Sequence, residues 1–426
     1  LKKISYYGNL MTNNSLKYLK GKKILVTGHT GFKGSWLCIM LNHIGAKIYG
    51  ISLKPEKNSL FEKANISKIL KRNVICDIRN KKKLKKHIIN IKPDILIHLA
   101  AQSLVITGYK NPLMTYETNF IGTLNILENI KKVKSLKKVL IVTTDKVYDF
   151  SKSKKFNEND NLFGKDPYSA SKVCVEQLVY SYKSSYFNNI KLPEIYVGRS
   201  GNVIGGGDIA KYRIVPDIIK SIKFNKVLNV RNPNSIRPWQ HVLDPLYGYL
   251  VLISAKNLKK NNYAWNFGPK EKNFNKVSDI IKKFRTKFNF KFKFTNKKFH
   301  ETKALKLNSL KAKKFLNWQP KWNFNQTIEK IIDATRKLEK KVILDDEADF
   351  ASPDNKVNKS EEDASKINAL LQKLLSSGST EEKENVYIGV TATPGRLDLN
   401  NTFLNDSQEW VFVDPYPGTD SDDWHF

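Results

Sequence analysis

Short apolar runs alternate with longer helical stretches from Lys22 onward. The runs are rich in β-branched residues, a pattern typical of parallel strands that are buried on both faces. We expect core strands at Lys23–Thr27, Lys47–Ile51, Val74–Cys76, Ile95–His98 and Val139–Thr143. Because helical stretches fill the gaps, the pattern predicts βαβ units and an α/β fold with a Rossmann-type, doubly wound parallel sheet.

The helical stretches carry recognisable end signals. A helix is expected over Ser35–Ile44, ended by Gly45, and the longest helices are expected over Asn119–Lys132 and Ser169–Ser184, behind polar residues able to cap them. Beyond Gly198 the pattern becomes irregular, with three consecutive glycines and several prolines. This part predicts loops and short helices that build a smaller α/β lobe, which we expect to bind the substrate.

Pattern and composition divide the chain into four segments. At about residue 340 the composition changes from basic and aromatic to acidic and rich in Ser and Asn. Since the chain opens with Leu1, we expect a fragment or a mistaken start, with Met11 as the initiator. The expected segments are an N-terminal extension (1–20), a dinucleotide-binding Rossmann domain with the catalytic residues (21–200), a substrate lobe with some segments returning to the sheet (201–340), and an acidic α/β fragment (341–426).

The formal net charge of +34 first suggests nucleic-acid binding. Residues 341–426 hold 7 basic and 18 acidic residues, whereas the remainder holds 67 and 22, so the body alone carries +45. Its lysines are scattered among Ile, Asn and Phe without the regular aromatic spacing of a base-stacking surface. We therefore interpret them as a solvated surface that can attract an anionic substrate, and expect no nucleic-acid partner.

Cysteine usage and hydropathy indicate the compartment. Cys38, Cys76 and Cys174 lie far apart without CxxC spacing, which argues against a zinc site and against a secreted disulfide framework. No run approaches the roughly 18 apolar residues needed to span a bilayer. We expect a soluble cytoplasmic protein with no membrane partner and no metal.

The segment Gly28–Gly34 (GHTGFKG) follows a strand and opens a helix. Small residues there let backbone N–H groups approach a pyrophosphate, and the helix N-terminus adds partial positive charge. The alternative is a glycine-rich turn without a ligand. The sequence thus predicts a dinucleotide site, with Asp77 at the end of the third strand placed to face an adenine edge.

One feature of such sites is missing. An acidic residue at the end of the second strand normally holds the ribose hydroxyls of NAD. Here the chain reads Ile51-Ser52-Leu53-Lys54. Because Ser52 and Lys54 can tolerate a 2′-phosphate, the spacing leaves NAD and NADP both open.

Tyr168 and Lys172 stand one helical turn apart in YSASK. An ammonium group beside a phenol lowers the tyrosine pKa from about 10, so that the phenolate can accept an alcohol proton during hydride transfer. The YxxxK pattern alone can arise by chance in a chain rich in Tyr and Lys. Thr144, at the end of a core strand about 24 residues earlier, strengthens the interpretation because it can hydrogen-bond the same alcohol.

Thr144-Asp145-Lys146 adds an acid and an amine that a simple dehydrogenase does not need. Oxidation of a sugar C4 hydroxyl to a ketone acidifies the C5 proton. A base can then remove that proton while an acid protonates the departing C6 hydroxyl, and the stored hydride returns to C6. The segment therefore predicts a 4,6-dehydration, with a surface ion pair between Asp145 and Lys146 as the alternative.

Six motifs together resemble the CDP-glucose 4,6-dehydratase family of the extended short-chain dehydrogenases/reductases, also called the NAD-dependent epimerase/dehydratase family. The match covers most of residues 17–336. The lysine of TDK separates this family from dTDP- and GDP-sugar dehydratases, which carry Glu there. The motifs are VTGHTGFKGSWL (26–37), HLAAQ (98–102), TTDKVY (143–148), DPYSASK (166–172), GNVIGGGD (201–208) and RPWQHV (237–242).

The resemblance implies a lyase of deoxysugar biosynthesis that converts CDP-glucose to CDP-4-keto-6-deoxyglucose with tightly held NAD. Thr144 and Tyr168 would contact the alcohol, Lys172 would support the cofactor ribose, Asp145 would be the acid and Lys146 the elimination base. A homo-oligomer, dimer or tetramer, is also implied. The implied substrate-binding residues are Asn202, Arg213, Arg237 and His241, of which the arginines would grip the pyrophosphate. The implied cofactor-binding residues are Gly28, Thr30, Gly31, Phe32, Lys33, Gly34, Ser52, Asp77, Ile78, Leu99, Ala100, Ala101, Gln102, Thr143, Tyr168 and Lys172.

Two departures from the family pattern concern the site. The family usually reads QPLVR after HLAA, whereas Gln102 is followed here by Ser103-Leu104-Val105-Ile106, without the arginine. Val147 replaces a residue that is commonly cysteine. The first departure leaves the nucleotide and the sugar open, so another nucleotide-sugar epimerase or reductase of the same fold stays an alternative.

The acidic tail carries a second resemblance. Val342–Asp349, an apolar run ending in DEAD, and Val390–Pro394 resemble segments of superfamily 2 helicases, in which Asp346 would coordinate magnesium and Glu347 would orient water. No GxxxxGK[ST] loop occurs in the chain to hold ATP phosphates. We expect a helicase-like fragment joined by gene fusion or by misassembly of the sequence; a nucleic-acid-dependent ATPase is the distant alternative.

Overall fold

The computed structural model describes residues 14–151, 155–189, 192–256, 258, 263–270, 274–295, 302, 304–339, 342–345 and 386–389. Contacts within the chain divide it into two units, Leu1–Ile332 and Asp333–Phe426. In the second unit, strands β14 (Val342–Asp345) and β15 (Val386–Gly389) pair in parallel. The helicase-like features expected at Asp346, Glu347 and Val390–Pro394 lie outside the described residues.

A seven-stranded sheet forms the centre of the first unit, and every pairing within it is parallel. Its strands β1, β2 and β3 run outward in one direction, while β4, β5, β6 and β11 follow on the other side of β1. The chain therefore reverses its winding between β1 and β4, and a crevice opens at their carboxyl ends. From edge to edge the strands are β11 (Ala264–Phe267), β6 (Glu194–Ser200), β5 (Lys138–Val142), β4 (Ile95–His98), β1 (Lys23–Thr27), β2 (Lys47–Ser52) and β3 (Arg72–Ile75).

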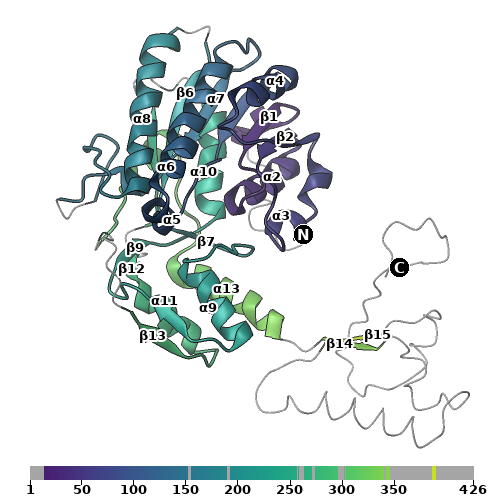
Figure 1. Cartoon of the computed structure of the whole chain (residues 1–426), viewed down its shortest axis with the longest axis vertical. Helices are drawn as coiled ribbons and strands as arrows, with labels where there is room; N and C mark the ends of the chain where they lie inside the picture. The colour runs from purple at the N-terminus through teal and green to yellow at the C-terminus, as the bar shows by residue number, and fades with distance from the viewer. Residues whose placement is uncertain are drawn as a thin grey trace, which may run out of the picture. The chain divides into compact units, whose positions relative to one another are not determined.

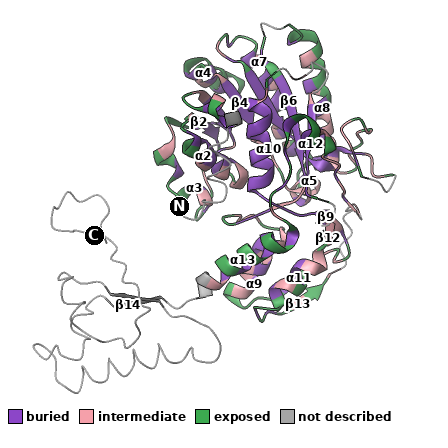
Figure 2. Ribbon diagram, turned by 180° about the vertical axis from the view of Figure 1, so that it is seen from behind, coloured by how far each residue is buried: buried purple, intermediate pink, exposed green. Residues whose placement is uncertain are grey.

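Helices cover both faces of this sheet (Figure 1). Alternate residues of a strand point to opposite faces, so Ile24 and Val26 join a different core from Leu25. The first core includes residues of α2 (Phe32–Ile44) and α10 (Leu243–Ser254). The second core includes residues of the helices on the other face, α4 (Lys81–Ile91), α7 (Gly122–Ile130) and α8 (Pro167–Tyr186). Figure 2 shows the sheet buried between these layers, which confirms the predicted Rossmann-type α/β fold.

Several predicted boundaries were wrong. Helix α2 begins at Phe32 instead of Ser35, because Gly31 already occupies the N-cap position. The helical region predicted from Asn119 begins at Pro112, where the Asn111 side chain accepts a hydrogen bond from Met114 N. It continues through α6 (Pro112–Tyr116) and a π-helical turn (Glu117–Ile121) into α7.

Two further differences concern β3 and α8. Strand β3 was expected to be buried on both faces, but it lies at the sheet edge and only Val74 among its residues is buried. Helix α8 begins at Pro167, since the Asp166 side chain caps it by accepting from Ser169 N. These helices therefore begin before the apolar pattern does, directly after the N-cap residues Gly31, Asn111 and Asp166.

A smaller lobe with its own apolar core lies below the sheet in the view of Figure 1. Its core joins residues such as Ile218, Phe284 and Ile328 from three helices. These helices are α9 (Ile214–Phe224), α11 (Val277–Arg285) and α13 (Phe324–Glu339). The strand pairs of this part are β8 (Leu228–Val230) with β13 (Phe292–Phe294), β9 (Ile236–Pro238) with β12 (Phe274–Lys276), and β7 (Val203–Ile204) with β10 (Gln240–His241).

The remaining described elements are short, and they are α3 (Leu60–Lys63), α5 (Val105–Lys110), α12 (Leu310–Leu316) and single turns at Asn14–Leu19, Ile66–Ile69 and Asp145–Val147. Within the described residues no helix has the length and apolar character to cross a bilayer. The same part of the chain contains no group of three or more His, Cys, Asp or Glu side chains placed to hold a metal ion.

Candidate active site

The glycine-rich turn after β1 is held in a conformation that needs its glycines. Gly28 has φ of +74°, and a Cβ atom there would lie 2.7 Å from Ala100 N. A Cβ atom on Gly34 would lie 2.1 Å from Gly28 O. The backbone is therefore packed closely, with the N-terminus of the 13-residue α2 directly behind the turn. This arrangement is suited to a phosphate group.

A cavity of about 520 Å³, here called the larger cavity, runs along the carboxyl edge of the sheet from the turn. The structure brings all sixteen residues expected to bind the cofactor to its wall. They are Gly28, Thr30, Gly31, Phe32, Lys33, Gly34, Ser52, Asp77, Ile78, Leu99, Ala100, Ala101, Gln102, Thr143, Tyr168 and Lys172. Its size, elongated lining and glycine turn fit a dinucleotide.

The end of the larger cavity near β2 and β3 combines a hydroxyl pair with an ion pair. Ser52 Oγ and Thr30 Oγ1 lie 2.7 Å apart. Arg79 Nη2 lies 2.7 Å from Asp77 Oδ2, and this hydrogen bond lowers the pKa of the Asp77 carboxyl. Arg79, which the sequence analysis missed, and Lys54 also line this end. Directly after β2, where an acidic residue usually holds the ribose, the cavity is lined by Ser52 and Lys54, with Glu56 two residues further on.

Tyr168 and Lys172 are buried on the same face of α8, beside Thr144 at the end of β5. Burial lowers the pKa of Lys172 to about 8, opposed by the charge of Glu176. Burial also raises the pKa of Tyr168 to about 12, opposed by a hydrogen bond with Thr144. This direction is opposite to the lowering expected from the sequence, because the loss of water around the phenol outweighs the Thr144 hydrogen bond and the charge of Arg213.

The turn Asp145–Val147 continues directly from Thr144, which caps it by accepting from Lys146 N at 3.3 Å. Asp145 is 3% exposed, so it is not part of a surface ion pair. Its Oδ1 accepts from Thr144 Oγ1 at 3.1 Å, while Oδ2 has no hydrogen-bond partner among the described residues. Burial raises the pKa of this carboxyl, opposed by Lys146 and Arg237, which favours the protonated form needed by an acid.

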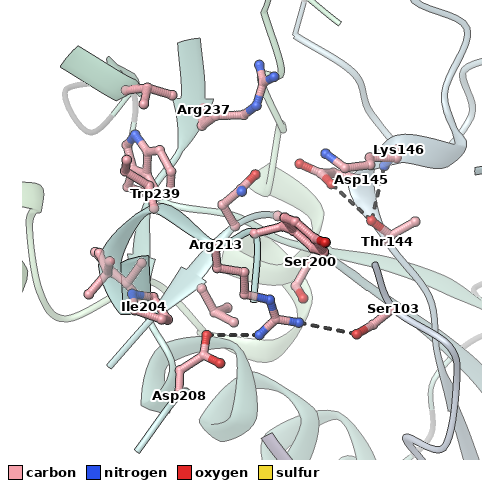
Figure 3. Close-up of a pocket in the computed structure, with 18 of the residues that line it drawn as sticks. Ser103, Thr144, Asp145, Lys146, Ser200, Ile204, Asp208, Arg213, Arg237 and Trp239 are labelled. Atoms are coloured by element: carbon pink, nitrogen blue, oxygen red, sulfur yellow. Dashed lines mark hydrogen bonds and ion pairs between the residues drawn. The ribbon is translucent and has the colours of Figure 1, made fainter. Parts of the chain in front are cut away.

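A second cavity of about 260 Å³, here called the smaller cavity, shares part of its wall with the larger one. Figure 3 shows residues that line it. Thr144, Asp145, Lys146 and Tyr168 line it, as do three of the four residues expected to bind substrate, Asn202, Arg213 and Arg237. Both cavities share six residues, which are Lys33, Ser103, Thr143, Tyr168, Asp208 and Arg213.

The two arginines of the smaller cavity are held in different ways. Arg213 lies where the cavities meet, with Nη1 2.9 Å from Asp208 Oδ2 and Nη2 donating to Ser103 Oγ at 3.2 Å (Figure 3). Arg237 is buried, and its Nη1 donates to the carbonyl oxygens of Ile236 and Thr302. Two fixed guanidinium groups thus face one small cavity, a combination suited to phosphate oxygens.

His241 is not brought to the site. It lines neither cavity, its ring meets Trp322 edge to face with centroids 3.9 Å apart, and its Nδ1 accepts from Leu243 N. Burial lowers its pKa to about 3. The expectation that it binds substrate came from its motif, but β10 carries it into the protein while Arg237 and Trp239 face the cavity.

The family model described as GDP-mannose 4,6 dehydratase matches residues 25–331. The chain belongs to this family. It is 40% identical over 326 residues to a CDP-glucose 4,6-dehydratase of Salmonella typhimurium, covering 74% of this chain and 90% of that protein. It is 25% identical to a CDP-paratose 2-epimerase of Salmonella typhi, over 74% of this chain and all of that protein.

Solved structures share the fold. A dTDP-glucose 4,6-dehydratase from Bacillus anthracis, solved in complex with NAD, has a TM-score of 0.64 at 24% identity, over 75% of this chain and 98% of that one. The family match ends at residue 331. The acidic tail therefore lies outside the part that places the chain among the 4,6-dehydratases.

In this member of the GDP-mannose 4,6-dehydratase family, the surroundings of Lys33 and Ser200 were not predicted from the sequence. Lys33 Nζ donates to Ser200 Oγ at 2.9 Å and to Tyr249 OH at 3.2 Å. Burial, together with the charges of Arg213 and Lys172, lowers the pKa of Lys33 to about 7, opposed by the charge of Asp145. Ser200 was missed, although its place at the carboxyl end of β6 is the signal that identifies ligand-facing residues in such sheets.

Proposed function

We propose that this protein is an NAD-dependent CDP-glucose 4,6-dehydratase, a hydro-lyase that forms CDP-4-keto-6-deoxyglucose. The 40% identity to a CDP-glucose 4,6-dehydratase over 90% of that enzyme supports the substrate. The observation that carries the reaction type is the placement of Asp145 and Lys146 in one cavity with Thr144 and Tyr168. An oxidation site and an acid–base pair then act on the same sugar.

The larger cavity would hold the cofactor. The fit rests on Gly28 and Gly34, whose missing Cβ atoms let the turn pack closely against Ala100 and against its own backbone, in front of the N-terminus of α2. A turn of this kind at a helix N-terminus is suited to a pyrophosphate. Bound NAD would take the hydride from sugar C4 and return it to C6. We favour NAD over NADP because related dehydratases are solved with NAD, although β2 ends in Ser52 and is followed by Lys54, without an acid at its end.

Thr144 and Tyr168 would hold the C4 hydroxyl during oxidation. Tyr168 acts as the phenolate, accepts the hydroxyl proton as the hydride leaves and becomes the neutral phenol. The positive charge of Lys172 favours the phenolate that this step requires. Since the pKa of Lys172 is about 8, this lysine is mainly cationic at neutral pH. The burial of both groups strengthens their interaction because little water screens it.

Lys146 and Asp145 would carry out the elimination. The Lys146 amine takes the C5 proton, which the C4 ketone has acidified. The Asp145 carboxyl gives its proton to the C6 hydroxyl, which leaves as water. The raised pKa of Asp145 suits this role, because the group must be protonated when the C–O bond breaks.

The substrate diphosphate would lie against Arg213 and Arg237, with Asn202 beside them. Arg213 contacts Asp208 and Ser103, so a diphosphate that reaches its guanidinium replaces one of these contacts. The basic body of the protein would attract the doubly charged substrate.

The test is turnover of CDP-glucose carrying deuterium at C4. A 4,6-dehydratase forms a keto-sugar with a mass lower by one water and with deuterium at C6, because the hydride returns within the same active site. dTDP-glucose, GDP-mannose and UDP-glucose, assayed in parallel, test the nucleotide. Loss of water from none of the four would refute the proposal. Epimerisation without loss of water would favour an epimerase of the same fold.

We also propose that the enzyme works in the cytoplasm as a homo-oligomer. Several large side chains on neighbouring helices α6, α8 and the turn between α6 and α7 are exposed, with Leu113 at 70%, Tyr180 at 53% and Ile121 at 41%. Such a face is suited to a second copy of the chain. Light scattering coupled to gel filtration would measure the mass; a monomer at all concentrations would refute this part.

A further inference from the structure

Behind the reactive groups lies a buried ion pair that neither cavity reaches. Glu176 on α8 and Arg199 on β6 have side-chain exposures of 0% and 1%. Glu176 follows Lys172 by one helical turn, as Lys172 follows Tyr168, so the three lie on one face of α8. Neither member of the pair lines the larger or the smaller cavity.

The pair contacts both ends of the segment that carries the acid and the base. Glu176 Oε1 accepts from Thr143 Oγ1 at 2.7 Å and from Arg199 Nε at 2.9 Å. Arg199 Nη1 donates to Tyr148 OH at 2.7 Å. Thr143 immediately precedes Thr144, and Tyr148 immediately follows the turn Asp145–Val147. The ion pair thereby fixes the residues on either side of Thr144, Asp145 and Lys146.

A further layer of hydrogen bonds anchors the pair. Tyr148 OH donates to Asn266 Oδ1 at 2.7 Å, and Asn266 N donates to Glu158 Oε1 at 2.8 Å. The network therefore connects β5, α8, β6 and β11 behind the site. Burying an ion pair contributes little net stability compared with apolar packing, so its presence is better explained by the geometry that it imposes.

We propose that Glu176 and Arg199 are positioning residues of the dehydration, which hold Thr144, Asp145 and Lys146 opposite Tyr168 and place a negative charge one turn from Lys172. The inference rests on the proposed function, because it assigns these groups their roles. According to this inference, dehydration also requires a charged pair that contacts neither the substrate nor the cofactor.

The charge of Glu176 has a separate consequence for Lys172. Lys172 carries a charge that lowers the pKa values of Lys33 on α2 and of His98 on β4. Tyr168 lies one turn earlier on α8, and Arg199 on β6 is paired with Glu176. His98 is neutral because burial lowers its pKa to about 3. Glu176 raises the pKa of Lys172 against burial. Without this carboxylate the pKa of Lys172 falls below about 8, and the cation is lost at a lower pH.

The test compares Glu176→Gln, which keeps the size and removes the charge, with Glu176→Asp. In Glu176→Gln we expect kcat for CDP-glucose to fall about tenfold or more with KM little changed. The alkaline limb of the kcat profile should move down by about one pH unit. In Glu176→Asp, the pH at which kcat falls on the alkaline side should return to the wild-type value, and kcat should recover in part. Glu194→Gln removes a carboxylate from the other end of β6 and should behave as wild type.

Arg199→Lys separates geometry from charge, because it keeps the positive charge and loses the contact to Tyr148. We expect kcat to fall while the alkaline limb stays in place. The same variant serves if Glu176→Gln does not fold. A lower melting temperature in the Glu176 and Arg199 variants, with unchanged kcat and an unchanged limb, would mean a purely structural pair and would overturn the proposal.

A measurement that needs no turnover distinguishes this inference from the proposed function. The rate at which Lys172 is acetylated at increasing pH, read by mass spectrometry, reports the pKa of Lys172 directly. Glu176→Gln should shift that titration to lower pH even if wild type acts on another nucleotide sugar. Absence of product from wild type would refute the proposed function alone, whereas an unshifted titration would refute the charge role of Glu176.

Discussion

The larger and the smaller cavity adjoin each other but are built differently. Close to α2, the wall of the larger one is formed by the closely packed backbone of Gly28–Gly34 and Leu99–Ala101, at the ends of neighbouring strands. The smaller one is lined by charged side chains from the turn Asp145–Val147, the 205–213 loop, α9 and β9. The shape of the larger cavity near α2 depends on glycines that carry no side chain. The shape of the smaller cavity depends on charged side chains that are held in place by their contacts.

This difference determines how each cavity responds to change. A close-packed backbone turn cannot absorb one extra carbon atom, because its neighbours are backbone atoms that cannot rotate away. Charged side chains can be replaced without a clash, but each replacement removes one chemical step or one contact. We therefore expect changes in the larger cavity to act on cofactor binding and changes in the smaller cavity to act on turnover.

The largest effect is expected for Lys146→Ala in the smaller cavity. Loss of the elimination base should lower the dehydration rate by about a thousandfold. Oxidation at C4 should continue, because Thr144, Tyr168 and Lys172 remain. Stopped-flow absorbance would follow the reduced nicotinamide, and mass spectrometry the loss of water. Full turnover in this variant would show that Lys146 is not the base and would favour epimerisation.

The next effect is expected for Gly34→Ala in the larger cavity. Its Cβ atom would lie 2.1 Å from Gly28 O, so the turn must move and NAD affinity should fall by about a hundredfold or more. Gly206→Ala is the matched control, since a Cβ atom there would meet nothing within 4 Å and Gly206 lines neither cavity. Calorimetric titration with NAD would compare the two. Equal affinities would mean that the turn does not hold the pyrophosphate.

All sixteen residues that the sequence predicted for the cofactor line the larger cavity, and many of them could be found because their determinants are local. A strand, a glycine turn and a helix follow one another within Lys23–Ile44, and other strands contribute residues at their carboxyl ends. The edge position of β3 was not predictable in the same way, since Val74 and its neighbours read as an apolar run whether or not another strand covers them.

The smaller cavity was predicted in part because its residues meet only through tertiary contacts. Arg213 reaches Ser103, 110 positions away in the chain, and no local pattern encodes that approach. The Glu176–Arg199 pair was missed for the same reason. Burial also reversed the expected direction for the pKa of Tyr168, because spacing within a helix shows the neighbouring Lys172 but not the loss of water.

A smaller effect, on stability, is expected at Lys33, which lines both cavities. Its pKa is about 7 when folded and 10.5 ordinarily, so between these values the unfolded chain binds a proton that the folded chain does not. The free energy of unfolding should therefore rise with pH across this window, by up to about 1.4 kcal/mol per pH unit. The destabilisation is fully present below pH 7.

Lys33→Met should remove this contribution, which urea unfolding at several pH values would measure. The variant should gain stability over wild type at neutral pH, and the gain should disappear toward pH 10.5. Lys47→Met, at an exposed position at the start of β2, is the control. A constant difference between Lys33→Met and wild type at all pH values would contradict the depressed pKa.

The smallest effect on catalysis is expected for His241, which shares the RPWQHV segment with Arg237. Because His241 packs against Trp322 outside both cavities, His241→Ala should leave kcat and KM within about twofold while lowering the free energy of unfolding by about 1–3 kcal/mol. Arg237→Ala, four residues earlier, should raise KM for the nucleotide sugar by about tenfold because a phosphate contact is lost. Steady-state kinetics would measure kcat and KM of both variants, and chemical unfolding would measure their free energies of unfolding. A raised KM in His241→Ala at unchanged stability would place this histidine at the substrate and show that the lobe closes further around it.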